Sequence, residues 1–343
     1  MKEVDLSKYE IRTDLVVDLI EKSPSFETKT VIDDITISNI KLDERNSKEL
    51  NKEKGDYTTI YFKDITDTSN YEKVLEVTTN ELSKMLKNSK IKDEYFCLII
   101  GLGNEKSTAD ELGVTTAKKV IVTKHIYDLT GTLEEGYRVT ACLIPGVMGT
   151  TGIETSDVIS SVIEKVKPDF IIAIDALASD SIDRLLKTIQ ITNTGINPGS
   201  GVGNNRKEIS EKVFNIPVIA IGVPTVVEAS TIVNDTLNYM KKSFSYNIKN
   251  KNKSSDKLIP TSNINYLKNN PYTLSKEESK VFLGILGDLT DYEKKVFIKD
   301  ILNPIGYDLI VTPKEIDFIV QKLTDLISSA INNCIHNIST KKV

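Results

Sequence analysis

Two aspartates stand where predicted buried strands give way to loops. Asp175 directly follows the apolar run Phe170–Ile174, and Asp110 lies in the loop after the run Tyr95–Ile100. In an open parallel sheet, the carboxyl ends of the strands meet at one edge, where ligands collect. An acidic residue at the end of an apolar run is costly to bury without a partner. The sequence therefore predicts that Asp110 and Asp175 lie close together.

Paired carboxylates can hydrolyse a peptide bond. Two carboxylates in a partly desolvated cleft cannot both ionise easily, so the pKa of one of them rises. The charged carboxylate can then take a proton from water while the neutral one protonates the scissile amide. The same spacing is equally compatible with a helix cap at Asp110 and a hydrogen-bonded buried acid at Asp175.

Two further loops are expected at the same edge. The loop after the apolar run Val139–Ile144 carries Glu154 and Asp157, and a glycine-rich segment contains Ser200 and Gly201. Glycine lets a backbone approach a ligand closely, although a mobile loop is the commoner explanation for a segment with so much glycine. We expect Glu154, Asp157, Ser200 and Gly201 to contribute to substrate binding.

Short apolar runs alternate with helical stretches in the middle of the chain. This alternation predicts an α/β fold, with a mainly parallel sheet and helices on both faces. Peripheral strands are expected within residues 28–65, a surface insertion at 246–275, and a helical region at the C-terminus. The four buried strands are expected at 95–100, 139–144, 170–174 and 217–221, and the helices at 111–128, 156–167, 226–244, 276–286, 291–302 and 314–333.

Composition and charge exclude several classes of protein. The 343 residues carry 44 Lys and Arg against 49 Asp and Glu, and this balance does not favour direct nucleic-acid binding. No apolar run is long enough to span a membrane, and the N-terminus lacks a secretory signal, so we expect a cytoplasmic protein. Three widely spaced cysteines fit reduced thiols better than disulfides.

Motifs for cofactors and for other nucleophiles are missing. Lys106 stands where a dinucleotide fingerprint would need its third glycine, and no Cys/His cluster suggests zinc, so no cofactor or metal is expected. His125 and His336 have no neighbouring Ser or Cys arranged as a nucleophile, which leaves serine and cysteine mechanisms poorly supported.

The chain resembles the bacterial spore germination proteases along nearly its whole length. The resemblance implies a fold similar to that of hydrogenase-maturation peptidases and an atypical aspartic mechanism. In the family's motif, the two proposed catalytic aspartates fall on Asp110 and Asp175. The resemblance is carried by Tyr9–Leu15, Gly101–Asn104, Ile144–Gly149, Thr151–Asp157, Pro168–Ala178, Pro198–Gly203 and Val311–Glu315.

The same resemblance implies a zymogen. It would be a homotetramer in the forespore and spore core that loses residues 1–14 as a propeptide, leaving residues 15–343 as a single α/β peptidase domain. The mature enzyme would cleave small acid-soluble spore proteins at germination. The family cuts between an acidic and an apolar residue, and the bond Asp14–Leu15 matches that pattern.

Two alternatives come from other functional classes. A metal-dependent peptidase of the hydrogenase-maturation type would use Asp110, Glu154 and Asp175 as oxygen ligands. A non-enzymatic module would bind the spore proteins without cutting them.

Overall fold

The computed structural model describes residues 13–20, 26–198, 207–250, 274–302 and 309–336. The chain divides into two compact units. One unit comprises Arg12–Val226 and Thr312–Val343, and the other comprises Met1–Ile11 and Val227–Val311. Both aspartates of the predicted pair belong to the first unit.

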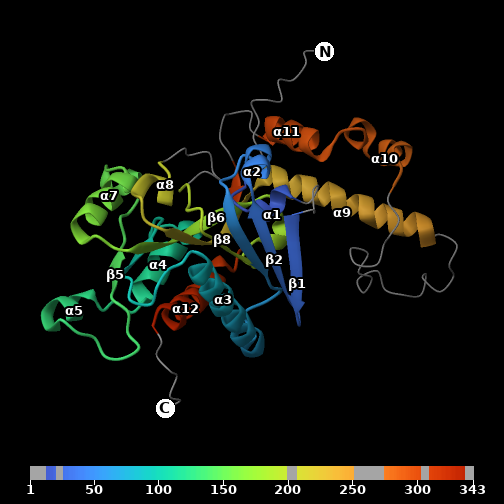
Figure 1. Ribbon diagram of the computed structural model, residues 1–343. Coiled ribbons are helices and arrows are strands. Elements are labelled where there is room, and N and C mark those ends of the chain that lie inside the picture. The colour runs from blue at the N-terminus through green and yellow to red at the C-terminus, as the bar shows by residue number, and fades with distance from the viewer. Residues whose placement is uncertain (1–12, 21–25, 199–206, 251–273, 303–308, 337–343) are drawn as a thin grey trace. The chain divides into compact units, whose positions relative to one another are not determined.

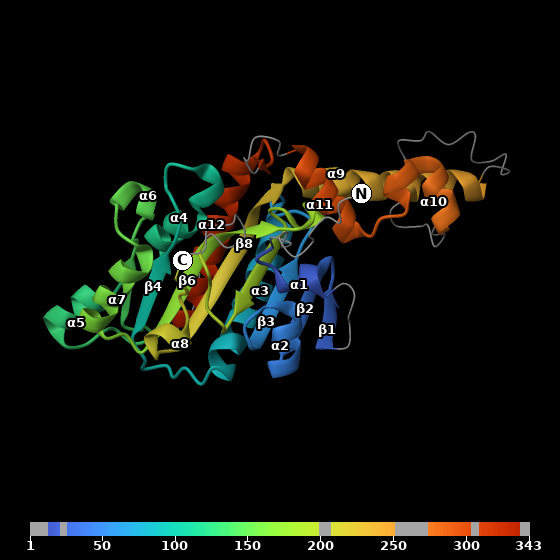
Figure 2. The ribbon, with the colours of Figure 1, turned by 90° about the horizontal axis from the view of Figure 1, so that it is seen from above.

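The described strands form one mixed sheet, seen in Figure 1 and from above in Figure 2. The strand β4 pairs parallel with its neighbours β5 and β6. The strands β1, β2, β3, β7 and β8 pair antiparallel in that order. In sheet order the strands are β1 (Glu27–Ile32), β2 (Ile35–Leu42), β3 (Gly55–Tyr61), β7 (Thr188–Thr192), β8 (Val218–Glu228), β6 (Phe170–Ser179), β4 (Cys97–Gly101) and β5 (Thr140–Leu143).

The α/β class is confirmed, but the expectation of a mainly parallel sheet was wrong. Ile32 pairs with Ile35, so only Asp33 and Asp34 connect β1 to β2. A loop of two residues forces antiparallel pairing, because parallel strands need a long crossover. Asp33 adopts the positive φ of 51° that such tight hairpins require.

Helices cover both faces of the sheet in the first unit, as expected. On one face, Ile159 of α7 packs in a cluster with Leu98 and Ile100 of β4. On the other face, Gly101 approaches Gly113 of α4. The first face also carries α1 (Val16–Leu19), α2 (Glu44–Leu50), α7 (Thr155–Val166) and α8 (Glu211–Phe214), while α3 (Thr68–Asn88), α4 (Leu112–Lys119) and α12 (Ile316–Ile335) form the opposite layer (Figure 1).

Two strands run further than the sequence indicated. Asp175 was expected at the end of a strand, but β6 continues through it to Ser179. The pairing of β6 with β4 does end at Ile174, opposite Gly101, so Asp175 lies where β4 stops. The strand β8, which was expected to end at residue 221, continues through Gly222 to Glu228. An added Cβ at Gly222 would lie 2.4 Å from the Leu177 side chain, so the glycine makes room for packing.

The helix expected over residues 111–128 is divided. It consists of α4, which ends at Lys119, and α5 (Lys124–Thr130). The intervening β-branched residues restrict helix formation. The Thr123 hydroxyl also donates to the Arg138 carbonyl oxygen at 2.6 Å, so tertiary partners replace helical ones. The sequence analysis did not predict α3 or β7.

The second unit is helical apart from a short strand pair. β9 (Ile310–Val311) pairs with the last residues of β8, and Lys299 bonds Glu228 at 2.9 Å. Phe244 and Phe282 stack with ring centroids 4.6 Å apart. Its helices α9 (Ala229–Asn250), α10 (Lys276–Leu283) and α11 (Asp291–Leu302) correspond to the expected ones. Most of the expected insertion, residues 251–273, lies outside the described residues.

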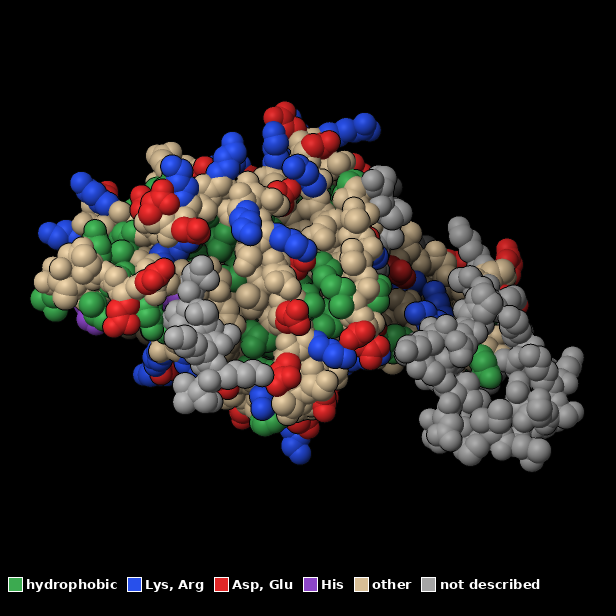
Figure 3. Space-filling model, turned by 60° about the horizontal axis from the view of Figure 1, so that its bottom comes forward, with side chains coloured by type: hydrophobic (Ala, Val, Ile, Leu, Met, Phe, Trp, Pro, Cys, Tyr) green, Lys and Arg blue, Asp and Glu red, His purple; other side chains and the backbone are tan. Residues whose placement is uncertain are grey.

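Charges of both signs are interspersed on the face shown in Figure 3. This distribution agrees with the near balance of acidic and basic residues in the sequence. Within the described residues, no helix is long and apolar enough to cross a membrane.

Gly113 provides a test of the packing that positions the sheet edge. An added Cβ would lie 2.2 Å from the Ile174 carbonyl oxygen and 2.4 Å from that of Leu102. Because both neighbours are strand backbone, Gly113→Ala should lower the free energy of unfolding by at least about 2 kcal/mol in urea denaturation. Gly149→Ala is the control, since nothing lies within 4 Å of its Cβ position. Equal stability of the two variants would contradict the close packing.

Candidate active site

Asp175 lies between two hydrophobic clusters on β6. Side chains alternate along a strand, so Ile171, Ala173, Asp175 and Leu177 share one face. Ile171 and Ala173 pack with α7, and Leu177 packs with α1. Asp175 is only 5% exposed, and its Oδ1 accepts the Ala176 N–H at 2.9 Å. The strand therefore buries this carboxylate in an apolar row.

Asp110 is held by backbone contacts at the end of a 3-10 turn, Thr108–Asp110. Its carbonyl oxygen accepts the Asn104 N–H at 3.0 Å. The buried Thr225 hydroxyl donates to the Ala109 carbonyl oxygen at 2.6 Å. Gly103 has a φ of +108°, and an added Cβ there would lie 1.9 Å from the Asp110 carbonyl oxygen and 3.3 Å from its Oδ1. Glycine at 103 thus permits both the loop's conformation and the approach of Asp110.

One hydrogen bond joins the segments that carry the two aspartates. The Leu102 N–H donates to the Ile174 carbonyl oxygen at 2.9 Å. Leu102 precedes Gly103, the neighbour of Asp110, and Ile174 precedes Asp175. The 3-10 turn with Asp110 also packs against β6. Both predicted residues therefore belong to segments that meet at the end of β4.

Glu111, next to Asp110, is an acidic residue that the sequence analysis missed. Partial burial is the main cause that raises its pKa, and the negative charges of Asp317 and Glu105 raise it further. No spacing rule distinguishes it from an ordinary helix-start glutamate.

Glu154 and Asp157 begin the helix α7. The Glu154 Oε1 is buried without a hydrogen-bond partner among the described residues, and the side chain does not cap the helix. Asp157 accepts from Lys207 at 2.8 Å. Lys207 is the first described residue after the glycine-rich segment. Ser200 and Gly201 are outside the described residues.

Other buried polar atoms in these two segments were not singled out from the sequence. Like Glu154, Glu208 has a buried carboxylate oxygen without a hydrogen-bond partner among the described residues. The buried hydroxyls of Ser156 and Ser210 also lack such a partner. Nothing in their sequence context marks them, because burial depends on the packing of segments far apart in the chain.

Asp14 and Leu15 are built into the first unit. The Asp14 N–H donates to the Ala178 carbonyl oxygen at 3.0 Å, and the Ala178 N–H donates to the Asp14 Oδ2 at 2.8 Å. The Asp14 carbonyl oxygen accepts from Gln190 Nε2 at 3.3 Å. Leu15 is fully buried in the cluster that contains Leu177. Both residues that flank the predicted cleavage bond are thus fixed beside β6.

The segment with Asp14 occupies an open edge of β6. Backbone groups alternate along a strand, and Ile174 directs its carbonyl toward Leu102 on the β4 side. Ala176 and Ala178 therefore face the same side, beyond the end of β4. The Ala176 N–H is taken by Asp175, and both backbone groups of Ala178 are taken by Asp14.

The cysteines and His336 have structural environments. Cys97, Cys142 and Cys334 are free thiols, and burial raises the pKa of each. The His336 Nδ1 accepts the Arg138 N–H, and its Nε2 lies 3.2 Å from the Ile121 carbonyl oxygen. Burial lowers the pKa of His336, which fits a neutral ring with both nitrogens bonded.

Asp110, Glu154 and Asp175 do not form a metal site of three ligands. Within the described residues, no group of three His, Cys, Asp or Glu side chains could hold a metal ion. The arrangement therefore does not favour the metal-ligand set considered from the sequence.

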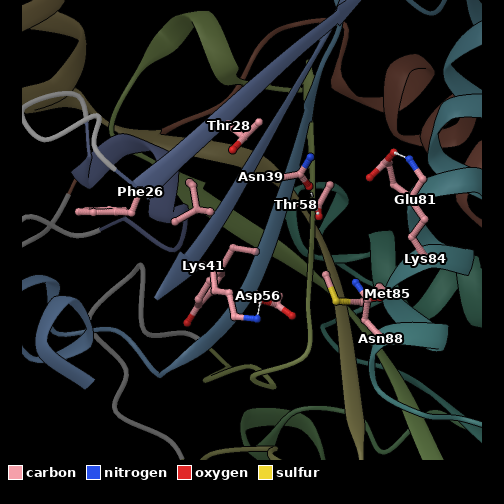
Figure 4. Close-up of a pocket in the computed structure, with 12 residues that line it drawn as sticks. Phe26, Thr28, Asn39, Lys41, Asp56, Thr58, Glu81, Lys84, Met85 and Asn88 are labelled. Atoms are coloured by element: carbon pink, nitrogen blue, oxygen red, sulfur yellow. Dashed lines mark hydrogen bonds and ion pairs between the residues drawn. The ribbon is translucent and has the colours of Figure 1, made fainter. Parts of the chain in front are cut away.

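A cavity of about 420 Å³ lies between β1–β3 and α3 (Figure 4). Its polar side chains pair with one another, since Thr58 donates to Asn39 at 2.8 Å and Lys84 to Glu81 at 2.6 Å. Neither aspartate of the predicted pair lines it. This cavity is separate from the edge where the segments of Asp110 and Asp175 meet.

Comparisons with known proteins find relatives along nearly the whole chain. A family model described as germination protease matches residues 20–343. The chain is 42% identical to the germination protease of Oceanobacillus iheyensis, covering 96% of this chain and 95% of the relative. It is 43% identical to that of Bacillus cereus strain AH187, covering 98% and 97%, and 40% identical to that of Priestia megaterium, covering 98% and 96%.

The chain belongs to the germination protease family. Membership indicates a peptidase, and therefore a hydrolase, of spore germination. The part matched by the germination protease model contains Asp110, Glu154 and Asp175, whereas Asp14 and Leu15 precede it.

Proposed function

We propose that the protein is a zymogen of an endopeptidase that cleaves small acid-soluble spore proteins in the spore core during germination. The observation that carries the proposal is the meeting of the Asp110 and Asp175 segments through the Leu102–Ile174 hydrogen bond. Paired carboxylates at a strand end supply the acid and the base that hydrolysis of an amide needs.

In the proposed mechanism, one of Asp110 and Asp175 is ionised and the other is protonated. The ionised carboxylate takes a proton from a water molecule that attacks the scissile carbonyl carbon. The protonated carboxyl donates to the carbonyl oxygen or to the departing nitrogen. The apolar row around Asp175 strengthens these interactions by limiting access of water.

Substrate binding is assigned to the rim formed by α7 and the glycine-rich segment. Glu154 has a buried oxygen that can accept an N–H of an extended peptide. Asp157 accepts a hydrogen bond from Lys207, the first described residue after that segment. Ser200 and Gly201 are included in this binding set on the basis of sequence alone.

The contacts of Asp14 suggest why the intact chain would be inactive. Residues 13 and 14 occupy the edge of β6 beyond β4, three residues from Asp175. At roughly 3.3 Å per strand residue, Ala178 lies about 10 Å along β6 from Asp175. The bond Asp14–Leu15 must therefore leave its place, or be cut by another copy, before it can be hydrolysed. Removal of residues 1–14 would free the backbone groups of Ala178 for a substrate strand.

Asp110→Asn and Asp175→Asn should each reduce cleavage of a small acid-soluble spore protein by at least about 10²-fold, because an amide cannot exchange the required proton. Turnover is measured by mass spectrometry of the products, and circular dichroism checks the fold. Glu154→Gln is the comparison variant, which should mainly raise KM. Near-normal turnover of either aspartate variant would defeat the proposed pair, and a Glu154→Gln loss as large as theirs would move Glu154 into the catalytic set.

Self-processing should produce a new N-terminus at Leu15. N-terminal sequencing after incubation should find it in the wild type and not in Asp175→Asn, because the same site is proposed to cut the precursor. Mixing the Asp175→Asn precursor with active enzyme distinguishes cutting within one chain from cutting between copies, because only another copy can cut the inactive variant. A terminus elsewhere, or equal processing in both proteins, would assign the cut to another enzyme. Sedimentation analysis of both forms tests the proposed homotetramer.

A further inference from the structure

The residues on the two sides of the bond Asp14–Leu15 share a buried carboxylate, Asp18. The Thr13 hydroxyl donates to the Asp18 Oδ2 at 2.6 Å. The Leu15 N–H donates to that same hydroxyl at 3.1 Å. Thr13 therefore bridges the nitrogen of the cleavable bond to the Asp18 carboxylate, and the two groups lie within two hydrogen-bond lengths of each other.

Asp18 also holds the chain that follows Asp175. Its Oδ2 accepts the Asp180 N–H at 2.8 Å and the Ser179 hydroxyl at 3.2 Å. Its Oδ1 lies 2.5 Å from the Arg184 Nε, and the Asp18 side chain is only 3% exposed. This carboxylate thus fixes the end of β6, the strand that carries Asp175.

The residues after the bond also have contacts that do not involve residues 13 and 14. Leu15, Val16, Val17 and Ile20 are buried in one hydrophobic cluster. The Val16 N–H donates to Gln190 Oε1 at 3.0 Å, and the Asp18 N–H lies 3.3 Å from the Leu15 carbonyl oxygen. A cut before Leu15 therefore leaves its nitrogen close to its present position.

Hydrolysis changes the charge of that nitrogen. The oxygen of water bonds to the Asp14 carbonyl carbon, the C–N bond breaks, and the nitrogen takes up protons. The products are an α-carboxylate on Asp14 and an α-ammonium on Leu15. Thr13 departs with the released peptide, so the hydroxyl that separated the nitrogen from Asp18 is removed.

We propose that Asp18 is a positioning residue of the mature enzyme, which binds the new α-ammonium group of Leu15 and thereby fixes the end of β6 beside Asp175. This inference rests on the proposed cleavage at Asp14–Leu15. The ammonium replaces the Thr13 hydroxyl as the donor to Asp18, so a hydrogen bond between two opposite charges replaces one from a neutral donor. The state of the N-terminus is thereby coupled to the strand of the catalytic site.

The other charges around Asp18 leave a place for the new cation. Arg184 approaches Oδ1, whereas the bridge to Leu15 uses Oδ2. Lys52 donates to the Thr13 carbonyl oxygen at 2.9 Å. Burial lowers the pKa of Lys52 below its ordinary value, and the charges of Asp14 and Asp18 offset only part of this effect. Cleavage removes the Asp14 carboxylate from the charges around Asp18 and adds the ammonium of Leu15.

The test measures the titration of the Leu15 α-amino group directly. Residues 11–13 are replaced by the recognition residues of an aspartate-specific endopeptidase. The full-length chain is folded intact, and this endopeptidase is then added to cut it after Asp14. Acetic anhydride is applied across a pH series, and mass spectrometry follows acetylation of the new terminus. A free α-amino group titrates at about 7.7–8.0. A nearby carboxylate favours the charged form and so raises this pKa.

In the cut wild type, the acetylation midpoint should lie above the ordinary range. In Asp18→Asn it should be at least about one pH unit lower, whereas Asp183→Asn, which alters an exposed acid of the same region, should match the wild type. Arg184→Gln removes the competing cation and should keep the midpoint raised, which provides a second variant if Asp18→Asn folds poorly. Equal midpoints in the wild type and Asp18→Asn, or an ordinary midpoint in Arg184→Gln, would overturn the proposal.

Turnover distinguishes positioning from a purely structural role. The kcat of the cut wild type should fall as pH rises through the acetylation midpoint, because the ammonium loses its charge, and Asp18→Asn should lack this decrease. The acetylation result does not require peptidase activity. A protein with a raised midpoint but no turnover would contradict the proposed function alone, and an active enzyme with an ordinary midpoint would contradict only the role of Asp18.

Discussion

The close approach of α4 to the ends of β4 and β6 is the constraint on which the rest of the site depends. Gly113 leaves no space for a side chain between the carbonyls of Leu102 and Ile174. This contact lets Leu102 bond Ile174 where β4 ends, and it brings the Asp110 turn against β6. A longer β4 would cover Ala176 and Ala178, and no open edge would remain beside Asp175.

Sequence reasoning expected the segments of Asp110 and Asp175 to meet because both aspartates interrupt or follow apolar runs, which is a local signal. It misjudged β6, since Asp175 is inside a longer strand and only the partner strand ends there. It expected peripheral strands within residues 28–65, but it predicted neither their antiparallel pairing nor β7. The pairing of β3 with β7 brings together residues far apart in the chain. Such pairing leaves no local mark.

The role of the N-terminal segment could not be predicted from its composition. Thr13–Asp18 mixes polar and apolar residues, and its sequence suggested only a cleavage site. In the structure, Leu15 and Val16 are core residues, Asp14 binds the strand that carries Asp175, and Asp18 binds Arg184. These contacts link residues more than 160 positions apart, so only the fold reveals them. The proposed processing therefore acts on a segment that is part of the fold.

The central claim is that Asp110 and Asp175 act as one unit, and a double-mutant comparison tests it most directly. The kcat for cleavage of a small acid-soluble spore protein is measured for Asp110→Asn, for Asp175→Asn and for the double variant. Groups that share one proton-transfer step are strongly non-additive. The account predicts that the double variant is no more than about threefold slower than the slower single variant. Losses that multiply would show two independent contributions and would contradict the pair.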